Sequence, residues 1–430
     1  MQSLAAPAKP LGHVGHRRRT SRRRMGRGVM LLAPLSAAAS VLNYASNLTF
    51  AHILGPAAYG DLTSLLALSV VAAVPFTAAQ TRVASRVAQV AADRLAPLVR
   101  DAVTRLGVLG LAVTLLYCAA IPVVVHALRL PATAPALALA ALIGVSLLFP
   151  ALQGTLQGLE RWAVFGVVGL AVAAARLAIG VPWALAGGGA GGAIGGQAIG
   201  MALCLAWLVW LLRREVAPIS VATVRPALTP PDLSGVAAGA SFVFYAILAN
   251  CDVIVAKIFV SPREAGQYAA LATVGKLVVF LPAAIAVIVV PSTATAGGSR
   301  RDRARVLRLA ALMVAGTALL AIIPAALAPG FVVRTMFGAR YAAIAPGVLP
   351  IVCAGGGLAL LYLLVTFTVA IEDSRWTTLL VLGVVLQVAL IGAFHRSATQ
   401  IALDQAAVVG AVLACNEAIC HPLLPWPARA

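Results

Sequence analysis

Two basic side chains lie inside apolar segments that are long enough to cross a membrane. Arg176 lies within WAVFGVVGLAVAAARLAIGVPW (162–183), and Lys276 lies within 268–295. A charged residue at the centre of a membrane helix costs about 2.5 to 3.5 kcal/mol on insertion scales, so each is a functional candidate. Such a cation can replace the lost hydration of an anion, and Arg offers a forked set of donors. The structural alternative is a side chain that snorkels outward or pairs with a helix carbonyl.

A second polar group lies in the apolar segment 235–259. Asn250 is a candidate to line a cavity, and Asp252 is followed five residues later by Lys257. Asp252 can pair with Lys257 or with Lys276, or it can bind a coupling proton or sodium ion. The sequence therefore predicts either an ion pair or an ion-coupling site here, and it leaves both open.

Side-chain amides recur at intervals of one helical turn. Asn43 and Asn47 flank Tyr44 in one apolar segment, and Gln153 and Gln157 repeat the spacing in another. Residues at positions i and i+4 share one face of a helix. We expect these side chains to line a cavity and to form hydrogen bonds with a polar ligand. Hydrogen bonding between helices accounts for the same pattern without any ligand.

No other motif predicts a catalytic centre, a metal site or a cofactor. The six cysteines lie singly and form no CxxC pair. A formal GxGxxG at 187–192 has no strand before it, as a dinucleotide site would need. Instead, Gly192, Gly196 and Gly200 predict a flat helix face for close packing. A glycosyltransferase in the membrane would need acids or histidines in a sizeable loop outside the bilayer. The longest outer segment, 329–345, which we interpret as a loop, contains neither, so we do not expect an enzyme.

The composition identifies the elements that carry these residues as membrane helices. Of 430 residues, 61% are hydrophobic and only 10% are charged, and the mean hydropathy is +0.98. A bilayer core of about 30 Å is crossed by about 20 helical residues. On that rule we predict twelve spans, at about 29–50, 61–81, 106–128, 135–156, 162–185, 192–212, 235–259, 268–295, 306–328, 346–370, 376–394 and 400–422. The alternating pattern of a β-barrel is absent.

The basic residues indicate the orientation of the chain. The net charge is +19, and most of the 32 Lys and Arg fall in loops on one side of the predicted spans. Such a bias is typical of cytoplasmic loops, so both termini are predicted to be cytoplasmic. The arginines lie in the loops between spans, and no polar domain with aromatic residues carries them. This distribution argues against nucleic-acid binding.

The spans divide into two halves of six. We predict a basic tail at 1–28, an N-terminal lobe at 29–212, a connector at 213–234, a C-terminal lobe at 235–424 and a short tail at 425–430. One fixed shift superposes Pro56 on Pro262 and Gly60 on Gly266, while Pro75 falls one residue from Pro282. This favours an internal duplication in which both halves keep one orientation, although any helix corner collects Pro and Gly. Pro75 and Pro282 are candidate hinges.

Two hairpins resemble a known family. NYASNLTFAHILGPAAYGDLTSLLAL (43–68) and LANCDVIVAKIFVSPREAGQYAALATVGKLVVFLP (248–282) resemble bacterial polysaccharide flippases of the multidrug/oligosaccharidyl-lipid/polysaccharide exporter superfamily. The resemblance implies a MATE-like, all-α integral membrane fold of about twelve helices, with two six-helix bundles around a central cavity. It further implies a flippase in the bacterial cytoplasmic membrane that turns over a polyprenyl-pyrophosphate-linked oligosaccharide, without a cofactor. Glycosyltransferases or a polymerase of the same pathway would be its partners.

Two other functions stay open at this point. An antiporter for small cationic drugs would need a buried carboxylate facing its cargo, and only Asp252 is well placed for that role. A scaffold that assists glycan synthesis without transport would tolerate the loss of Arg176, whereas a flippase should not.

Overall fold

The computed structural model describes residues 13–216, 233–295, 300–370 and 375–420. Nearly all of these residues are helical, and none of them forms a strand. The elements are α1 (His13–Gln89), α2 (Ala92–Ala127), α3 (Ala134–Ser146), α4 (Phe149–Gly158), α5 (Trp162–Trp183), the π-helical turn η1 (Ala184–Gly188), α6 (Gly189–Val216), α7 (Leu233–Leu248), α8 (Cys251–Phe259), α9 (Pro262–Thr295), α10 (Arg300–Leu327), α11 (Pro329–Phe337), the 3₁₀ segment η2 (Ala339–Gly347), α12 (Val348–Ala370), α13 (Arg375–Ala393) and α14 (Ala398–Cys420).

Each of the twelve predicted spans coincides with a helix or with two consecutive helices. Within the described ranges, nine helical segments are long and apolar enough to cross a membrane. Pro34–Gln89 covers the second predicted span and the first from residue 34 on, and Trp162–Arg213 contains the fifth and sixth. The eighth predicted span lies on α9. The chain is therefore an all-helical, multi-pass membrane protein, as the sequence predicted.

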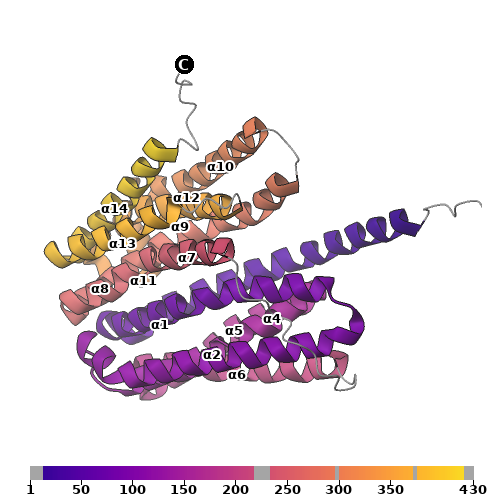
Figure 1. The fold of residues 1–430 in the computed structure, drawn as a ribbon. Coiled ribbons are helices and arrows are strands. Elements are labelled where there is room, and N and C mark those ends of the chain that lie inside the picture. Colours follow the sequence, from indigo (N-terminus) through magenta and orange to yellow (C-terminus); the bar gives the residue numbers. More distant parts are fainter. Residues whose placement is uncertain (1–12, 217–232, 296–299, 371–374, 421–430) are drawn as a thin grey trace, which may run out of the picture.

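The helix α1 supplies the first two spans because it bends at Gly55. This residue has φ 71° and ψ 174°, a backbone conformation that favours glycine. Figure 1 shows the chain turning back at this point. We call residues 13–54 the first arm of α1 and residues 56–89 its second arm.

The helices form two lobes, one from α1 to α6 and the other from α7 to α14 (Figure 1). Across the boundary, α1 packs extensively on α9 and also contacts α7 and α8. The largest cluster of buried apolar side chains contains Phe50 and Leu62 of α1 together with Val253 and Leu271 of the second lobe. The two lobes therefore share one continuous core along the seam between α1 and α9.

Parts of the predicted domain boundaries lie outside the described residues. These parts are residues 1–12 of the basic tail, residues 217–232 of the connector and the tail at 425–430. The helix α1 begins at His13, so the described part of the predicted tail is helical.

Small residues hold α5 against α6, as the glycine spacing predicted. A Cβ atom at Gly196 would contact the backbone of Gly180, and one at Gly200 would overlap the side chain of Ala175. Gly192 lies against Trp183. Because lipid removes most of the hydrophobic drive for helices to associate, close backbone approach of this kind stabilises the pair.

The interpretation of 329–345 as a loop was wrong. This segment forms the short helix α11 and then the 3₁₀ segment η2, with a break at Gly338, where φ is 81°. Val333, Phe337, Tyr341 and Ile344 are buried and join the shared core. The apolar side chains of this segment pack into the core between neighbouring helices. The segment is amphipathic, and each of its two helical pieces is too short to resemble a span.

Candidate functional site

Arg176 of α5 lies buried in the first lobe. Its side chain is only 7% exposed, and Nη2 donates a hydrogen bond to Oδ1 of Asn47 over 2.9 Å. The guanidinium carbon lies 5.6 Å from the ring centroid of Phe50, within the range of a cation–π contact. Both partners come from the first arm of α1, which packs closely on α5.

The charge of Arg176 has no carboxylate partner among the described residues. Its contacts are an amide oxygen and an aromatic face, and its Nε is buried without a hydrogen bond. A buried cation without a paired anion is costly, because dipoles compensate only part of the lost hydration. The arrangement therefore favours the binding of an anionic group beside Arg176.

Lys276 of α9 is held in a similar way in the second lobe. Its Nζ donates to Oδ1 of Asn250 over 2.9 Å, and Nδ2 of Asn250 donates to the carbonyl of Ala246 over 2.8 Å. Asn250 lies at the break between α7 and α8, where the backbone leaves helical geometry. Each lobe thus holds one cation through an asparagine oxygen, and both asparagines lie in the first predicted span of their half.

Asp252 is buried beside this pair. It is 3% exposed, its Oδ2 accepts a hydrogen bond from the Tyr268 hydroxyl over 2.7 Å, and its Oδ1 is buried without a partner. Lys276 is near enough to interact with it electrostatically. The ion-coupling role of Asp252 stays a prediction.

Of the two ion pairs left open for Asp252, the one with Lys257 is not formed. Nζ of Lys257 lies 2.6 Å from Oδ1 of Asp61, in the second arm of α1. Five residues turn a helix through about 500°, so residues 252 and 257 point to different sides of α8. Asp61 is the first residue of the predicted span 61–81, and nothing in the sequence around it indicates a partner in the other lobe.

The other predicted cavity residues are partly accessible. Asn43 is exposed, while Tyr44, Gln153 and Gln157 are half-buried. No hydrogen bond from the side-chain amide of Gln153 or Gln157 is found among the described residues, and the Tyr44 hydroxyl is buried without one. These groups keep their hydrogen-bonding capacity, and their contact with a ligand stays a prediction.

The candidate hinges are only partly described. Pro75 is exposed in the second arm of α1, which continues as a helix on both sides of it. Pro282 lies within the described backbone of α9, but its side chain lies outside the described side chains. Motion at either proline stays a prediction.

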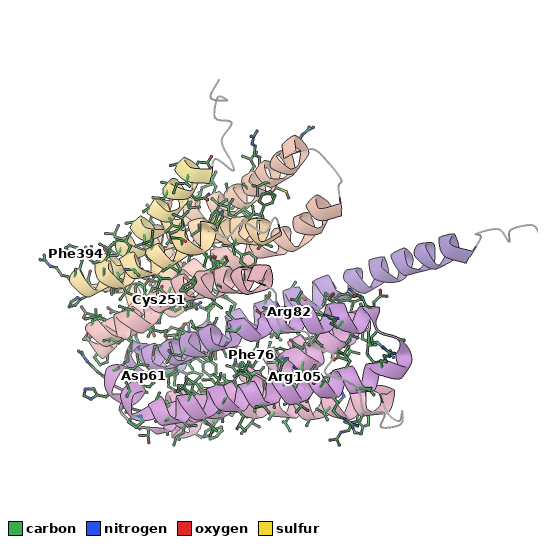
Figure 2. All side chains as sticks on the ribbon, in the orientation of Figure 1. Asp61, Phe76, Arg82, Arg105, Cys251 and Phe394 are labelled. Carbon is green, nitrogen blue, oxygen red and sulfur yellow. The ribbon has the colours of Figure 1, made fainter. Side chains whose placement is uncertain are left out.

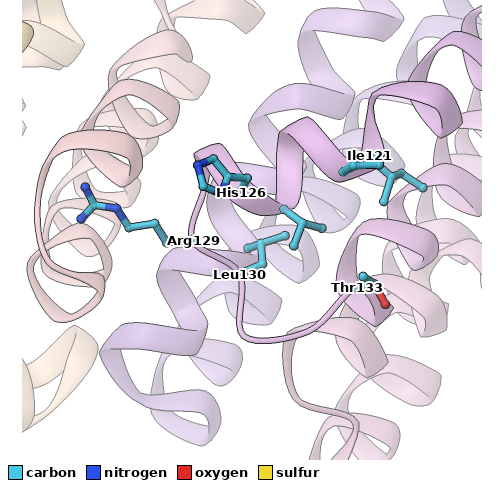
Figure 3. A pocket seen from close by; sticks show the side chains of 7 residues that line it. Ile121, His126, Arg129, Leu130 and Thr133 are labelled. Atoms are coloured by element: carbon cyan, nitrogen blue, oxygen red, sulfur yellow. The ribbon is translucent and has the colours of Figure 1, made fainter.

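A separate hollow lies at the end of α2 and in the turn to α3 (Figure 3). It is lined by Ile121, Pro122, Val125, His126, Arg129, Leu130 and Thr133. Arg129, one of the lining residues, has a positive φ of 48°. None of the predicted site residues lines this hollow, so it is distinct from the two buried cations.

The chain is similar to known proteins in its fold. No protein-family model and no curated protein sequence matches the chain. The structure of a multidrug resistance MATE family transporter of the MOP superfamily, inward-facing, is similar with a TM-score of 0.68 and 13% identity, over 88% of this chain and 92% of that one. Lipid II flippase MurJ, in an inward closed conformation, gives a TM-score of 0.69 and 12% identity, over 91% and 87%.

A third solved structure, an outward-facing MATE family transporter of the MOP superfamily, is less similar. Its TM-score is 0.58 with 11% identity, over 91% of this chain and 94% of that one. The chain has the fold shared by MATE transporters of the MOP superfamily and the flippase MurJ, as the resemblance of its two hairpins predicted.

Proposed function

We propose that the protein is a membrane transporter that moves a polyprenyl-pyrophosphate-linked oligosaccharide from the cytoplasmic to the outer leaflet by alternating access. The observation that carries this proposal is the buried cation of Arg176, which has no carboxylate partner among the described residues. A pyrophosphate that crosses the bilayer needs a group of this kind to replace its hydration.

The second cation strengthens the case for an anionic cargo. Lys276 lies on α9 and the Arg176 partner Asn47 lies on α1, and these two helices pack on each other along the seam between the lobes. Both cations donate to neutral amides, and the nearby carboxylate of Asp252 offsets part of the charge of Lys276 but none of the charge of Arg176. An anion that moves along the seam would meet one cation from each lobe.

The sugar part of the cargo requires hydrogen-bonding groups that the protein does not use internally. Gln153 and Gln157 meet this requirement, as does the exposed Asn43. We assign these residues and Tyr44 to the wall of the cavity that receives the glycan.

The cationic-drug alternative is weaker on the same geometry. Its candidate carboxylate, Asp252, is 3% exposed and already accepts a hydrogen bond from Tyr268. A carboxylate that is buried and hydrogen-bonded within its own lobe is poorly accessible to a cationic cargo. The scaffold alternative gives no reason for an uncompensated cation in the bilayer.

The remaining parts of the proposal follow from the cargo. The protein would lie in a bacterial cytoplasmic membrane with both termini cytoplasmic, as the bias of basic residues predicts. It would act without a cofactor and without making or breaking covalent bonds. Glycosyltransferases or a polymerase that build the same glycan would be its partners.

The test is transfer of a labelled polyprenyl-pyrophosphate oligosaccharide across proteoliposome membranes. Wild-type protein, Arg176→Ala and Arg105→Ala are compared after each is shown to be folded. Arg105 is exposed and pairs with Asp101 one turn earlier, so it controls for the loss of an arginine. We expect transfer by the wild type and Arg105→Ala but not by Arg176→Ala. Efflux of a cationic dye without transfer of any glycan would overturn the proposal.

A further inference from the structure

A buried ion pair joins the two lobes. Asp61 lies on the second arm of α1, Lys257 lies on α8, and Nζ of Lys257 is 2.6 Å from Oδ1 of Asp61. Their side chains are 6% and 1% exposed, so water is almost excluded from both charges. Within the described residues, the other acids near this corner have other partners, because Glu264 accepts from Ser261 and Asp252 accepts from Tyr268.

The ion pair belongs to a group of polar contacts that join the lobes at the same place. The hydroxyls of Tyr59 and Thr273 are hydrogen-bonded, with their oxygens 2.8 Å apart. The Tyr341 hydroxyl donates to the carbonyl of Ala51 over 3.2 Å. The partners of α1 here come from α8, α9 and η2, so three elements of the second lobe form polar contacts with one corner of the first lobe.

This corner lies at the end of the molecule that is predicted to face outward. Figure 2 shows Asp61 toward one end of the first lobe and Arg82 and Arg105 toward the other. Arg82 and Arg105 lie between the second and third predicted spans, on the side that the charge bias assigns to the cytoplasm.

An ion pair suits a contact that must open and close. In a seam that never opens, apolar side chains of similar volume would stabilise the contact at least as well, because desolvation offsets much of the Coulomb attraction. When the lobes separate, both ions regain water, so opening exposes no large apolar surface at this point. Breaking the pair without hydration is strongly unfavourable, so the closed seam also resists partial opening.

We propose that the Asp61–Lys257 ion pair is the outer gate of the transporter. It holds the lobes together on the outer side while the cargo enters from the cytoplasm, and it separates when the cargo is released. The inference rests on the proposed transport by alternating access, but the gate itself is measurable without any cargo.

The test measures the width of the outer seam. Spin labels are attached at Ala57 and Arg263, which are exposed and flank the corner in the two lobes, in a background without the native cysteines. Asp61→Asn and Lys257→Gln each remove one charge, and we expect the ratio of open to closed seams to rise about tenfold or more. The exchange of both charges, Asp61→Lys with Lys257→Asp, should restore the closed seam. Glu264→Gln removes a charge nearby without touching the pair and should change nothing.

Two outcomes would overturn the gate. One is an unchanged distance distribution in both single variants, and the other is an exchanged pair that stays as open as the single variants. If a single variant does not fold, the exchanged pair and the double neutral variant Asp61→Asn/Lys257→Gln still decide the question. Because these distances need no glycan, a failure of the gate is distinguishable from a failure of the proposed cargo.

Discussion

Gly60 and Gly266 lie backbone against backbone across the seam between the lobes. A Cβ atom at Gly60 would lie 2.9 Å from the amide nitrogen of Gly266, and one at Gly266 would overlap the carbonyl oxygen of Pro56. The two glycines also occupy equivalent positions in the duplicated sequence. Each copy of the corner therefore packs against the other copy, and this close contact requires a residue without a side chain at both positions.

This contact predicts that Gly266→Ala weakens the seam. The added methyl group has no space beside Pro56, and overpacking of this kind costs about 1 to 3 kcal/mol. We expect a lower melting temperature of the purified protein in detergent. The control is Gly316→Ala on α10, where nothing lies within 4 Å of the new atom and a helix-favouring residue replaces glycine. Equal melting temperatures for the two variants would contradict the close approach.

The buried hydrogen bond between Tyr268 and Asp252 gives a second prediction. Tyr268→Phe leaves both carboxylate oxygens of Asp252 without a hydrogen bond, which costs about 1 to 3 kcal/mol. Thermal unfolding should show this loss. Tyr117→Phe is the matched control, because the Tyr117 hydroxyl is buried without a partner and its removal should not destabilise the protein. A similar fall for both variants would assign the effect to the loss of any hydroxyl.

Hydropathy was sufficient to predict the spans and the buried cations, because both depend only on residues close together in the sequence. The twelve spans coincide with helices, and Arg176 is buried as a charge at that depth must be. The partner of Lys257 could not be predicted in this way, because Asp61 comes from the other lobe. Likewise, nothing in a single helix indicates that Tyr59 meets Thr273. Contacts between lobes depend on how two complete bundles dock.

The asparagine that holds Lys276 gives a third prediction. Asn250→Asp places a carboxylate where the Oδ1 acceptor now lies, 2.9 Å from Nζ, so Lys276 becomes part of an ion pair. If the free charge of Lys276 attracts the cargo, Asn250→Asp and Lys276→Gln should both raise the apparent KM of glycan transfer. Asp252 already lies near Lys276, and this makes the expected change smaller than for Arg176. An unchanged KM in both variants would make Lys276 structural.

Asn47→Asp gives the fourth prediction, in which stability and transport change in opposite directions. The new carboxylate would lie where Oδ1 of Asn47 now accepts from Arg176 over 2.9 Å, so the buried cation would gain a paired anion. Pairing removes part of the desolvation penalty, so the melting temperature should rise. The same pairing competes with a pyrophosphate for the guanidinium, so glycan transfer should fall about tenfold or more. Asn43→Asp adds an equal charge one turn away at an exposed position and should not raise stability. A stabilised variant that transfers glycan at the wild-type rate would show that Arg176 does not bind the cargo.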